Sequence, residues 1–171
     1  MSLQNKLYKE ILLKEKELEA LRKNGGKVNV EWDLPKVAVA CKYNGVERCG
    51  FSCNSNHVSR SDIIRPFYPL LERELLNQAP EAPKLPYVVF KKKRQPVVDM
   101  MSGDVIRYKK VVEKFIGTCA EDNAANCVLF GQNGRGVPQS LKDLSFVHPI
   151  RPRTLMRVRM CDVCRTIFTE P

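Results

Sequence analysis

Seven cysteines and two histidines are the residues of this chain whose spacing is typical of metal-binding sites. A first group, with C-x7-C-x3-C-x3-H spacing, is Cys41, Cys49, Cys53 and His57. The other cysteines are Cys119 and Cys127 (C-x7-C), followed later by Cys161 and Cys164 (C-x2-C). Seven thiols and one imidazole fill two tetrahedral zinc sites without remainder, whereas disulfides would leave one thiol unpaired. We therefore expect two zinc ions per chain.

The C-x2-C knuckle at Cys161–Cys164 is the strongest local metal signal, and Cys119 and Cys127 are its natural partners. Four thiolates leave no open position on the ion, so this spacing predicts a structural site. Two alternatives remain at this stage. His148 could replace one of the two partners, leaving a free thiol, or all four cysteines could be buried residues that act as small apolar side chains.

Residues 41–57, CKYNGVERCGFSCNSNH, resemble a CCCH zinc finger, with a middle gap of three residues that is shorter than the family's usual four or five. Locally they are similar to the pneumovirus transcription antitermination factors, and the resemblance covers 17 of 171 residues. The family implies recognition of single-stranded RNA through exposed aromatic side chains. Carried over by position, it implies that Tyr43 and Phe51 stack on bases while Lys42 and Arg48 meet phosphates.

The sequence gives little support for catalysis, and we expect no enzyme. His57 is followed by Val58-Ser59 and His148 by Pro149-Ile150, so neither histidine begins the H-x-E pattern of zinc deaminases. Metalloprotease, nucleophile-elbow and phosphate-loop motifs do not occur.

The net charge of +10 predicts attraction to polyanions, of which nucleic acid is the first choice. Alternating residues between 151 and 161 predict a strand that places arginines on one face and Met156, Val158 and Met160 on the other. The basic residues expected to contact phosphates are Lys91, Lys92, Lys93 and Arg94, together with Arg151, Arg153, Arg157 and Arg159. The run at 91–94 would serve equally as a nuclear localisation signal or a solvated loop.

Four segments are expected along the chain. Residues 1–24 form an amphipathic helix, capped by Ser2 and ended by Gly25-Gly26, which packs on its own domain or, as the alternative, forms a homodimer. Residues 25–78 form the CCCH-like module, 79–86 a proline-rich linker, and 87–171 a basic module with the four-cysteine zinc site. Strands are expected at 27–32, 37–41 and 87–90, and helices from Pro69 and over 102–116.

These observations predict a small α+β fold built around two structural zinc ions. We expect a nucleic-acid-binding regulatory protein, with RNA favoured over DNA, such as a viral transcription, replication or silencing-suppressor factor. The alternative is a zinc-stabilised adaptor whose basic surface docks a protein partner. No segment approaches the roughly 20 apolar residues that span a bilayer, so an intracellular location in cytoplasm or nucleus is expected.

Overall fold

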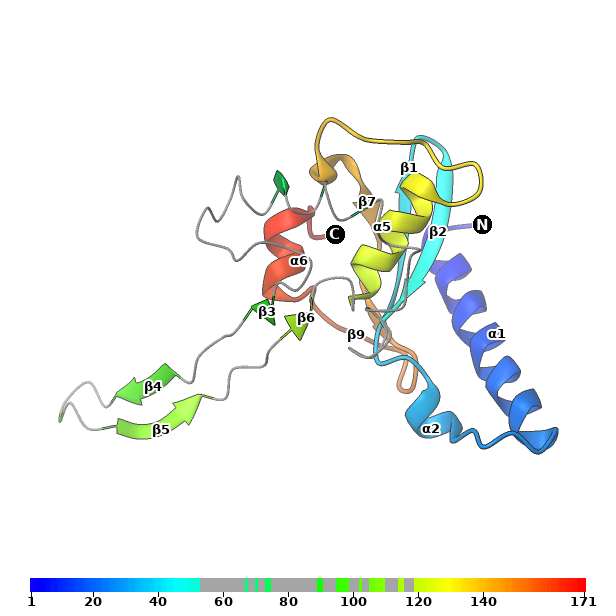
Figure 1. The fold of residues 1–171 in the computed structure, drawn as a ribbon, viewed down its shortest axis with the longest axis horizontal. Helices are drawn as coiled ribbons and strands as arrows, with labels where there is room; N and C mark the ends of the chain where they lie inside the picture. The colour runs from blue at the N-terminus through cyan, green and yellow to red at the C-terminus, as the bar shows by residue number, and fades with distance from the viewer. Residues whose placement is uncertain are drawn as a thin grey trace.

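The structure is a computed structural model that describes residues 1–52, 67, 70, 73–74, 89–90, 95–98, 102, 105–109, 114–115 and 119–171. Helices and strands of the described residues form an α+β fold, as predicted (Figure 1). No helix in this part of the chain has the length and apolar character needed to cross a membrane.

Helix α1 (Leu3–Lys23) confirms the predicted N-terminal helix. Its cap is Ser2, whose Oγ accepts a hydrogen bond from the Asn5 backbone N at 3.2 Å. The chain leaves the helix through Gly25, where φ is +82°. Leu7 and Ile11 are 0% and 1% exposed, so the helix buries one stripe against its own domain.

The central hairpin pairs β1 (Ala38–Tyr43) with β2 (Val46–Phe51). Asn44 and Gly45 join them with φ of 45° and 81°, the left-handed conformations that a two-residue hairpin turn requires. The predicted extended segment before Cys41 is therefore confirmed.

Strand β1 also pairs with β7 (Ser145–Phe146) and β8 (Ile150–Arg151), and β8 pairs with β9 (Met156–Arg157). The sheet order is β2-β1-β8-β9, with β7 beside β1. Strands from both predicted modules thus share one sheet, so the described parts of the two modules do not fold as separate domains. The proposed linker, 79–86, lies outside the described residues.

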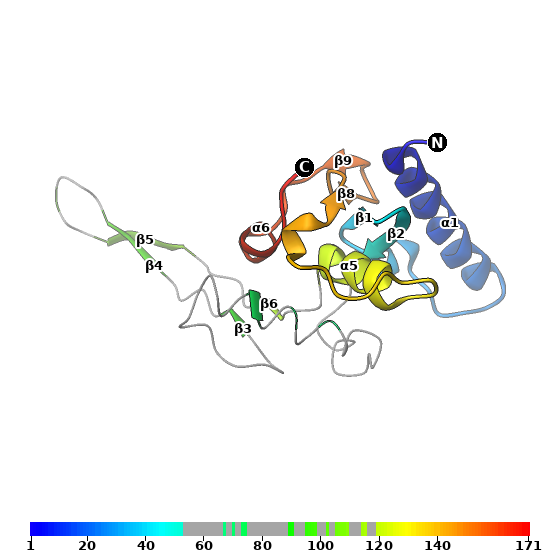
Figure 2. The ribbon, with the colours of Figure 1, turned by 90° about the horizontal axis from the view of Figure 1, so that it is seen from above.

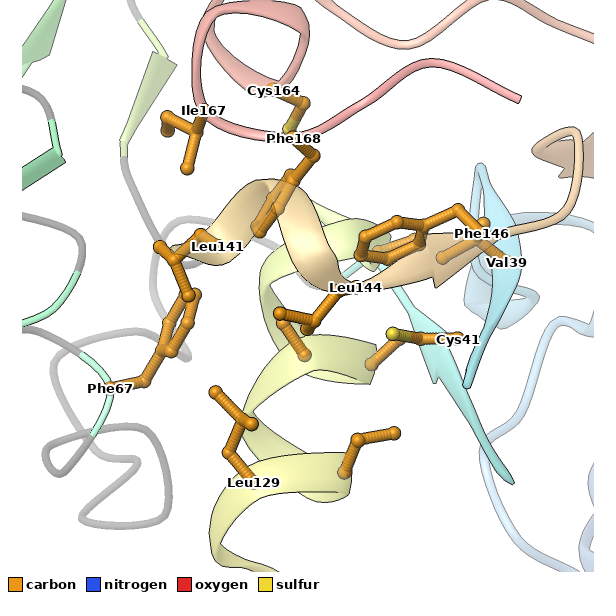
Figure 3. Close-up of a cluster of buried hydrophobic side chains, with 14 of the residues drawn as sticks. Val39, Cys41, Phe67, Leu129, Leu141, Leu144, Phe146, Cys164, Ile167 and Phe168 are labelled. Carbon is orange, nitrogen blue, oxygen red and sulfur yellow. The ribbon is translucent and has the colours of Figure 1, made fainter. Parts of the chain in front are cut away.

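Two helices cover the sheet from opposite sides (Figure 2). On the α1 side, Ala38 and Ala40 pack with Leu7, Ile11 and Ile150. On the other side, Val39 and Cys41 pack with α5 (Ala120–Phe130) and with residues from the C-terminal segments (Figure 3). The hydrophobic core is therefore divided into two clusters by the sheet.

Gly50 sets how closely α5 approaches the sheet. A Cβ atom at Gly50 would meet the carbonyl oxygen of Ala120 and the backbone N of Ala124, and would lie 2.8 Å from the Ala124 Cα. Glycine therefore allows the backbone of α5 to rest directly on β2.

The C-terminal segment contains the short 3-10 helix η2 (Leu141–Asp143), the β8–β9 hairpin and helix α6 (Asp162–Ile167). The single strand predicted over residues 151–161 is wrong. The chain reverses after Arg151, with Leu155 at φ +54° and its N donating to the Arg151 carbonyl at 2.8 Å. Pro152, which cannot donate to a strand ladder, begins this reversal. Met156, predicted to be buried, is 64% exposed.

Between residues 53 and 118, Leu70, Arg73 and Glu74 are helical, in line with the helix predicted from Pro69. The strands in this range are β3 (Val89–Phe90), β4 (Gln95–Val98), β5 (Val105–Lys109) and β6 (Lys114–Phe115). β4 pairs with β5 and β3 with β6. The helix predicted over 102–116 is wrong, because its β-branched and aromatic residues also suit strands. The strand predicted over 27–32 is wrong as well: α2 (Val30–Asp33) is a single helical turn, which Asp33 caps by accepting from the Asn29 N at 2.8 Å.

Candidate metal centre

Three thiols meet where helices α5 and α6 begin. The Sγ atoms of Cys119, Cys161 and Cys164 all lie within 4.8 Å of one another. The Cys119 and Cys161 sulfurs are 3.7 Å apart. Zn–S bonds of about 2.3 Å in tetrahedral geometry place two ligand sulfurs about 3.8 Å apart. The three thiols are therefore spaced as three ligands of one zinc ion would be.

The helix starts position these thiols. Cys119 is the extended N-cap residue of α5, and Cys161 is the extended N-cap residue of α6. The Cys161 Sγ accepts a hydrogen bond from the Cys164 backbone N at 3.4 Å. A bond of this kind orients the first sulfur of a C-x2-C knuckle toward the metal position.

Asn123 joins the end of strand β2 to this centre. Its Nδ2 donates to the Phe51 carbonyl at 2.8 Å and to the Cys119 carbonyl at 3.2 Å. Together with the close contact at Gly50, this amide fixes the first turn of α5 against the sheet. The position of Cys119 therefore depends on contacts from β2.

The surroundings raise the pKa of the clustered thiols. For Cys119 the largest cause is its hydrogen bond with Cys161, and burial and the charge of Asp122 raise its pKa further. The pKa of Cys164 rises through hydrogen bonds with Cys119 and Cys161 and through burial. A bound cation reverses this balance because it favours the thiolates. Thiolates at this spacing suit soft or borderline metal ions, a class that includes zinc.

Two carboxylates are buried in the first turn of α5, the helix that begins after Cys119, and the charge of Asp122 acts on the Cys119 and Cys164 thiols. Glu121 is 4% exposed and Asp122 is 2% exposed. Carboxylates are seldom so fully buried unless they are paired or coordinate a metal. The sequence analysis missed both residues, because the deaminase pattern was sought only at the two histidines. The signal was Cys119-Ala120-Glu121, a C-x-E sequence upstream of a C-x2-C knuckle.

The predicted four-cysteine site is brought together only in part. Cys127 is not among the clustered thiols, since it lies eight residues along α5 from Cys119, which is about 12 Å at 1.5 Å per residue. His148 is exposed and is not in the cluster either. The prediction of Cys127 as fourth ligand is therefore corrected, as is the His148 alternative.

The predicted CCCH site does not form from its two described cysteines. Cys41 stands opposite Arg48 and Cys49 opposite Ala40, so the two thiols project from opposite faces of the hairpin. Cys41 is buried on the α5 side, while Cys49 packs on the α1 side, where burial raises its pKa to about 11. The prediction that these two share one zinc ion is corrected. Cys53 and His57 lie outside the described residues.

The hairpin residues expected to contact RNA are also separated. Tyr43 packs against the α5-side core and Phe51 against the α1-side core, at opposite ends of the hairpin. Arg48 donates to the carbonyls of Gln132 and Glu47 at 2.6 and 2.8 Å, which gives it a structural role. Lys42 is 52% exposed and lies 3.6 Å from a Glu47 carboxylate oxygen. Tyr43 and Phe51 therefore do not form one stacking surface.

The four C-terminal arginines are exposed, as expected, but they do not share one strand face. Arg151 stands opposite Met156, and Arg157 opposite Ile150, so these two arginines lie on opposite faces of the β8–β9 hairpin. Arg159 forms an ion pair with Glu170 at 3.4 Å. Lys91–Arg94 lie outside the described residues.

Comparison of the chain with protein-family models, with curated proteins and with solved structures found no match.

Proposed function

We propose that this chain is a zinc-dependent hydrolytic deaminase that acts on an amino-substituted base of a nucleic acid. The observation that carries the proposal is a set of three clustered thiols with a buried glutamate two residues after the first of them. The sequence-based expectation of a non-enzymatic protein rested on the absence of known catalytic motifs, together with a site closed by four thiolates. Among the described residues three thiols cluster instead of four.

The number of ligands distinguishes structural from catalytic zinc. Structural sites are closed by four protein ligands, whereas catalytic sites use three and keep one position open. Zinc in such a site supplies a Lewis acid that lowers the pKa of a water molecule. Cys119, Cys161 and Cys164 would hold the ion, and the helix N-terminus at Cys119 favours the thiolate form of that ligand.

The order of the residues supports deamination within the wider class of zinc hydrolases. Zinc deaminases have a His or Cys ligand, a glutamate two residues later and a C-x2-C pair farther along the chain. Here these are Cys119, Glu121 and the pair Cys161 and Cys164, although Met160 stands where a proline usually precedes the pair.

Glu121 would act as the general acid and base of this reaction. Its carboxylate takes a proton from the attacking water and delivers it to the departing amino group. The water oxygen bonds to C4 of cytosine or C6 of adenine, the bond from that carbon to the amino nitrogen breaks, and ammonia leaves. The reaction needs water alone as co-reactant.

The charge of the chain supports a nucleic acid as substrate. A net charge of +10, with exposed arginines in the C-terminal segment, attracts polyanions. RNA remains the first choice, from the sequence-based expectation. The viral regulatory role, the protein partner and the homodimer remain predictions.

A second candidate is a non-catalytic, zinc-stabilised nucleic-acid-binding protein. The hydrogen bonds of Asn123 favour this candidate. Its side-chain amide donates to the carbonyls of both Phe51 and Cys119, which joins the end of β2 to the start of α5. Cys53 follows Phe51 by two residues in the sequence. A fourth thiolate from Cys53 would close the site and make the zinc structural.

Metal content and activity of single variants test both candidates. Native mass spectrometry should find one zinc per chain, lost in Cys161→Ser and retained in Cys127→Ser and Cys53→Ser. Glu121→Gln should retain zinc and lose deamination of cytosine- and adenine-containing oligonucleotides and nucleosides. Loss of zinc in Cys53→Ser would favour the structural site. Absence of zinc from the folded wild-type chain would overturn both candidates.

A further inference from the structure

The tip of the β8–β9 hairpin exposes two consecutive large apolar side chains. Leu155 is 46% exposed and Met156 is 64% exposed. The hairpin is labelled in Figure 2. Neither residue belongs to the buried clusters on the two sides of the sheet. Single exposed apolar residues are common on protein surfaces, but the backbone at Leu155 sets this pair apart.

Leu155 adopts a backbone conformation that leucine rarely takes. Its φ is +54°, in the left-handed region, where the Cβ atom crowds the following carbonyl oxygen. The Leu155 N and the Thr154 N both donate to the Arg151 carbonyl, at 2.8 and 3.2 Å. The Met156 N donates to the Thr154 Oγ1 at 3.4 Å. The turn therefore holds an exposed leucine where glycine or asparagine would be less strained, and strain of this kind is concentrated at functional sites.

Free positive charge flanks the tip. Arg151 precedes the turn and Arg157 follows it, and both side chains are exposed. Within the part of the chain that the structure describes, neither arginine forms an ion pair. The two arginines lie on opposite faces of the hairpin. An apolar tip is thus placed between two cations, one on each face.

This combination of groups suits a nucleic acid strand better than a lipid surface. A nucleic acid presents apolar base faces next to phosphates, so both parts of the tip have a partner. An anionic membrane offers the same two chemistries. However, two side chains bury less apolar surface than a myristoyl chain, which alone binds membranes only marginally.

We propose that Leu155, with Met156 beside it, inserts between neighbouring bases of a nucleic acid and unstacks them. Leucine and methionine are among the side chains that proteins insert between base steps. The inference rests on the proposed function in that a nucleic acid is the substrate. Met156 and Cys161 are five residues apart, so their Cα atoms are separated by at most about 18 Å. At roughly 3.4 Å per stacked base, the tip acts within about five nucleotides of the deaminated base, which must leave the stack to react.

Fluorescence of 2-aminopurine in a single-stranded RNA oligonucleotide tests the inference, because this base analogue becomes brighter when it is unstacked. The analogue is placed between adenines, and the zinc-loaded full chain should raise its fluorescence. Leu155→Asn should remove most of this rise at protein concentrations that saturate the RNA. Affinity should fall roughly 5- to 100-fold, because the burial of one leucine is lost while the cost of unstacking is avoided. The melting temperature should stay at or above the wild-type value, because asparagine tolerates a positive φ.

Three further variants separate insertion from charge. Met156→Gln should reduce the fluorescence rise. Leu13→Gln is its matched control, since Leu13 is 53% exposed on α1, and it should leave the rise unchanged. Arg157→Gln should flatten the salt dependence of binding by about one unit but keep the rise at saturation. Leu155→Asn should leave the salt dependence unchanged.

The outcomes separate this inference from the proposed function. A folded Leu155→Asn protein that gives the wild-type fluorescence rise would overturn the inference alone. A wild-type chain that does not bind the RNA, or binds it without a rise, would also overturn it, while deamination of free nucleosides would leave the proposed function standing. Leu155-dependent binding to phosphatidylserine vesicles, with no rise on RNA, would assign the tip to a membrane instead. A Leu155-dependent rise without any deamination would support insertion and count against the deaminase.

Discussion

Replacing Gly50 by alanine should displace the first turn of α5 and so disturb the metal centre. The new Cβ would lie 2.8 Å from the Ala124 Cα and closer still to backbone atoms of Ala120 and Ala124. Restoring a contact of about 3.4 Å requires the helix to move by at least roughly 0.6 Å, and overpacking of this kind typically costs about 1–3 kcal/mol. For a chain of this size, that lowers the melting temperature by roughly 2–12 °C. A displacement approaching 1 Å at a catalytic site reduces the rate by up to about 100-fold.

Gly45→Ala is the matched control for Gly50→Ala. Gly45 has φ of +81°, and a Cβ added there would have no atom within 4 Å, so alanine meets backbone strain at this position without a clash. That strain costs about 1–2 kcal/mol, which makes the two variants similar in stability. Thermal melting and competition with a zinc chelator should show that both are destabilised but that only Gly50→Ala binds zinc more weakly. Equal zinc affinity in the two variants would refute the link between β2 and the metal centre.

Ile11→Ala should destabilise the fold by about 2–5 kcal/mol in denaturant unfolding, whereas Leu13→Ala, on the exposed side of α1, should change stability by less than about 0.5 kcal/mol. Asn123→Ala should weaken zinc binding by roughly 10- to 100-fold in chelator competition, because the amide that orients Cys119 is lost. Zinc binding near neutral pH should release at least two protons, measured in weak buffer, because the raised pKa values of Cys119 and Cys164 keep these thiols protonated before the ion binds. Zinc binding should therefore weaken as pH falls.

Helices and strands whose limits are set by residues next to them in the sequence were predicted from capping residues, glycines and apolar runs. The helix ended by Gly25 and the extended segment before Cys41 were both predicted correctly. The helix predicted over 102–116 failed because apolar residues at helical spacing were also β-branched or aromatic. The prediction of a single strand over residues 151–161 was wrong, because residues that alternate with period two can also form two short strands joined by a chain reversal.

The thiol cluster was predicted in its residue type, but the grouping of the cysteines was predicted only in part. Cysteine spacing identified Cys119, Cys161 and Cys164, yet counting alone joined Cys41 with Cys49. Their separation in space depends on the hairpin register, which places them on opposite faces, and register was not predicted. The burial of Glu121, which is 4% exposed, is a property of the folded chain that a charged residue in a sequence does not reveal.

Comparison of deamination by zinc-loaded Glu121→Gln and by the wild-type chain tests the proposed catalytic role of Glu121 and of the three-thiol cluster. Both proteins are incubated with cytosine- and adenine-containing oligonucleotides and nucleosides, and products are detected by mass spectrometry together with ammonia release. We expect one zinc ion in each protein, and product from the wild-type chain alone. Equal product from both proteins would contradict the role of Glu121. A wild-type chain that holds one zinc and deaminates none of these substrates would contradict the catalytic assignment of the three-thiol centre.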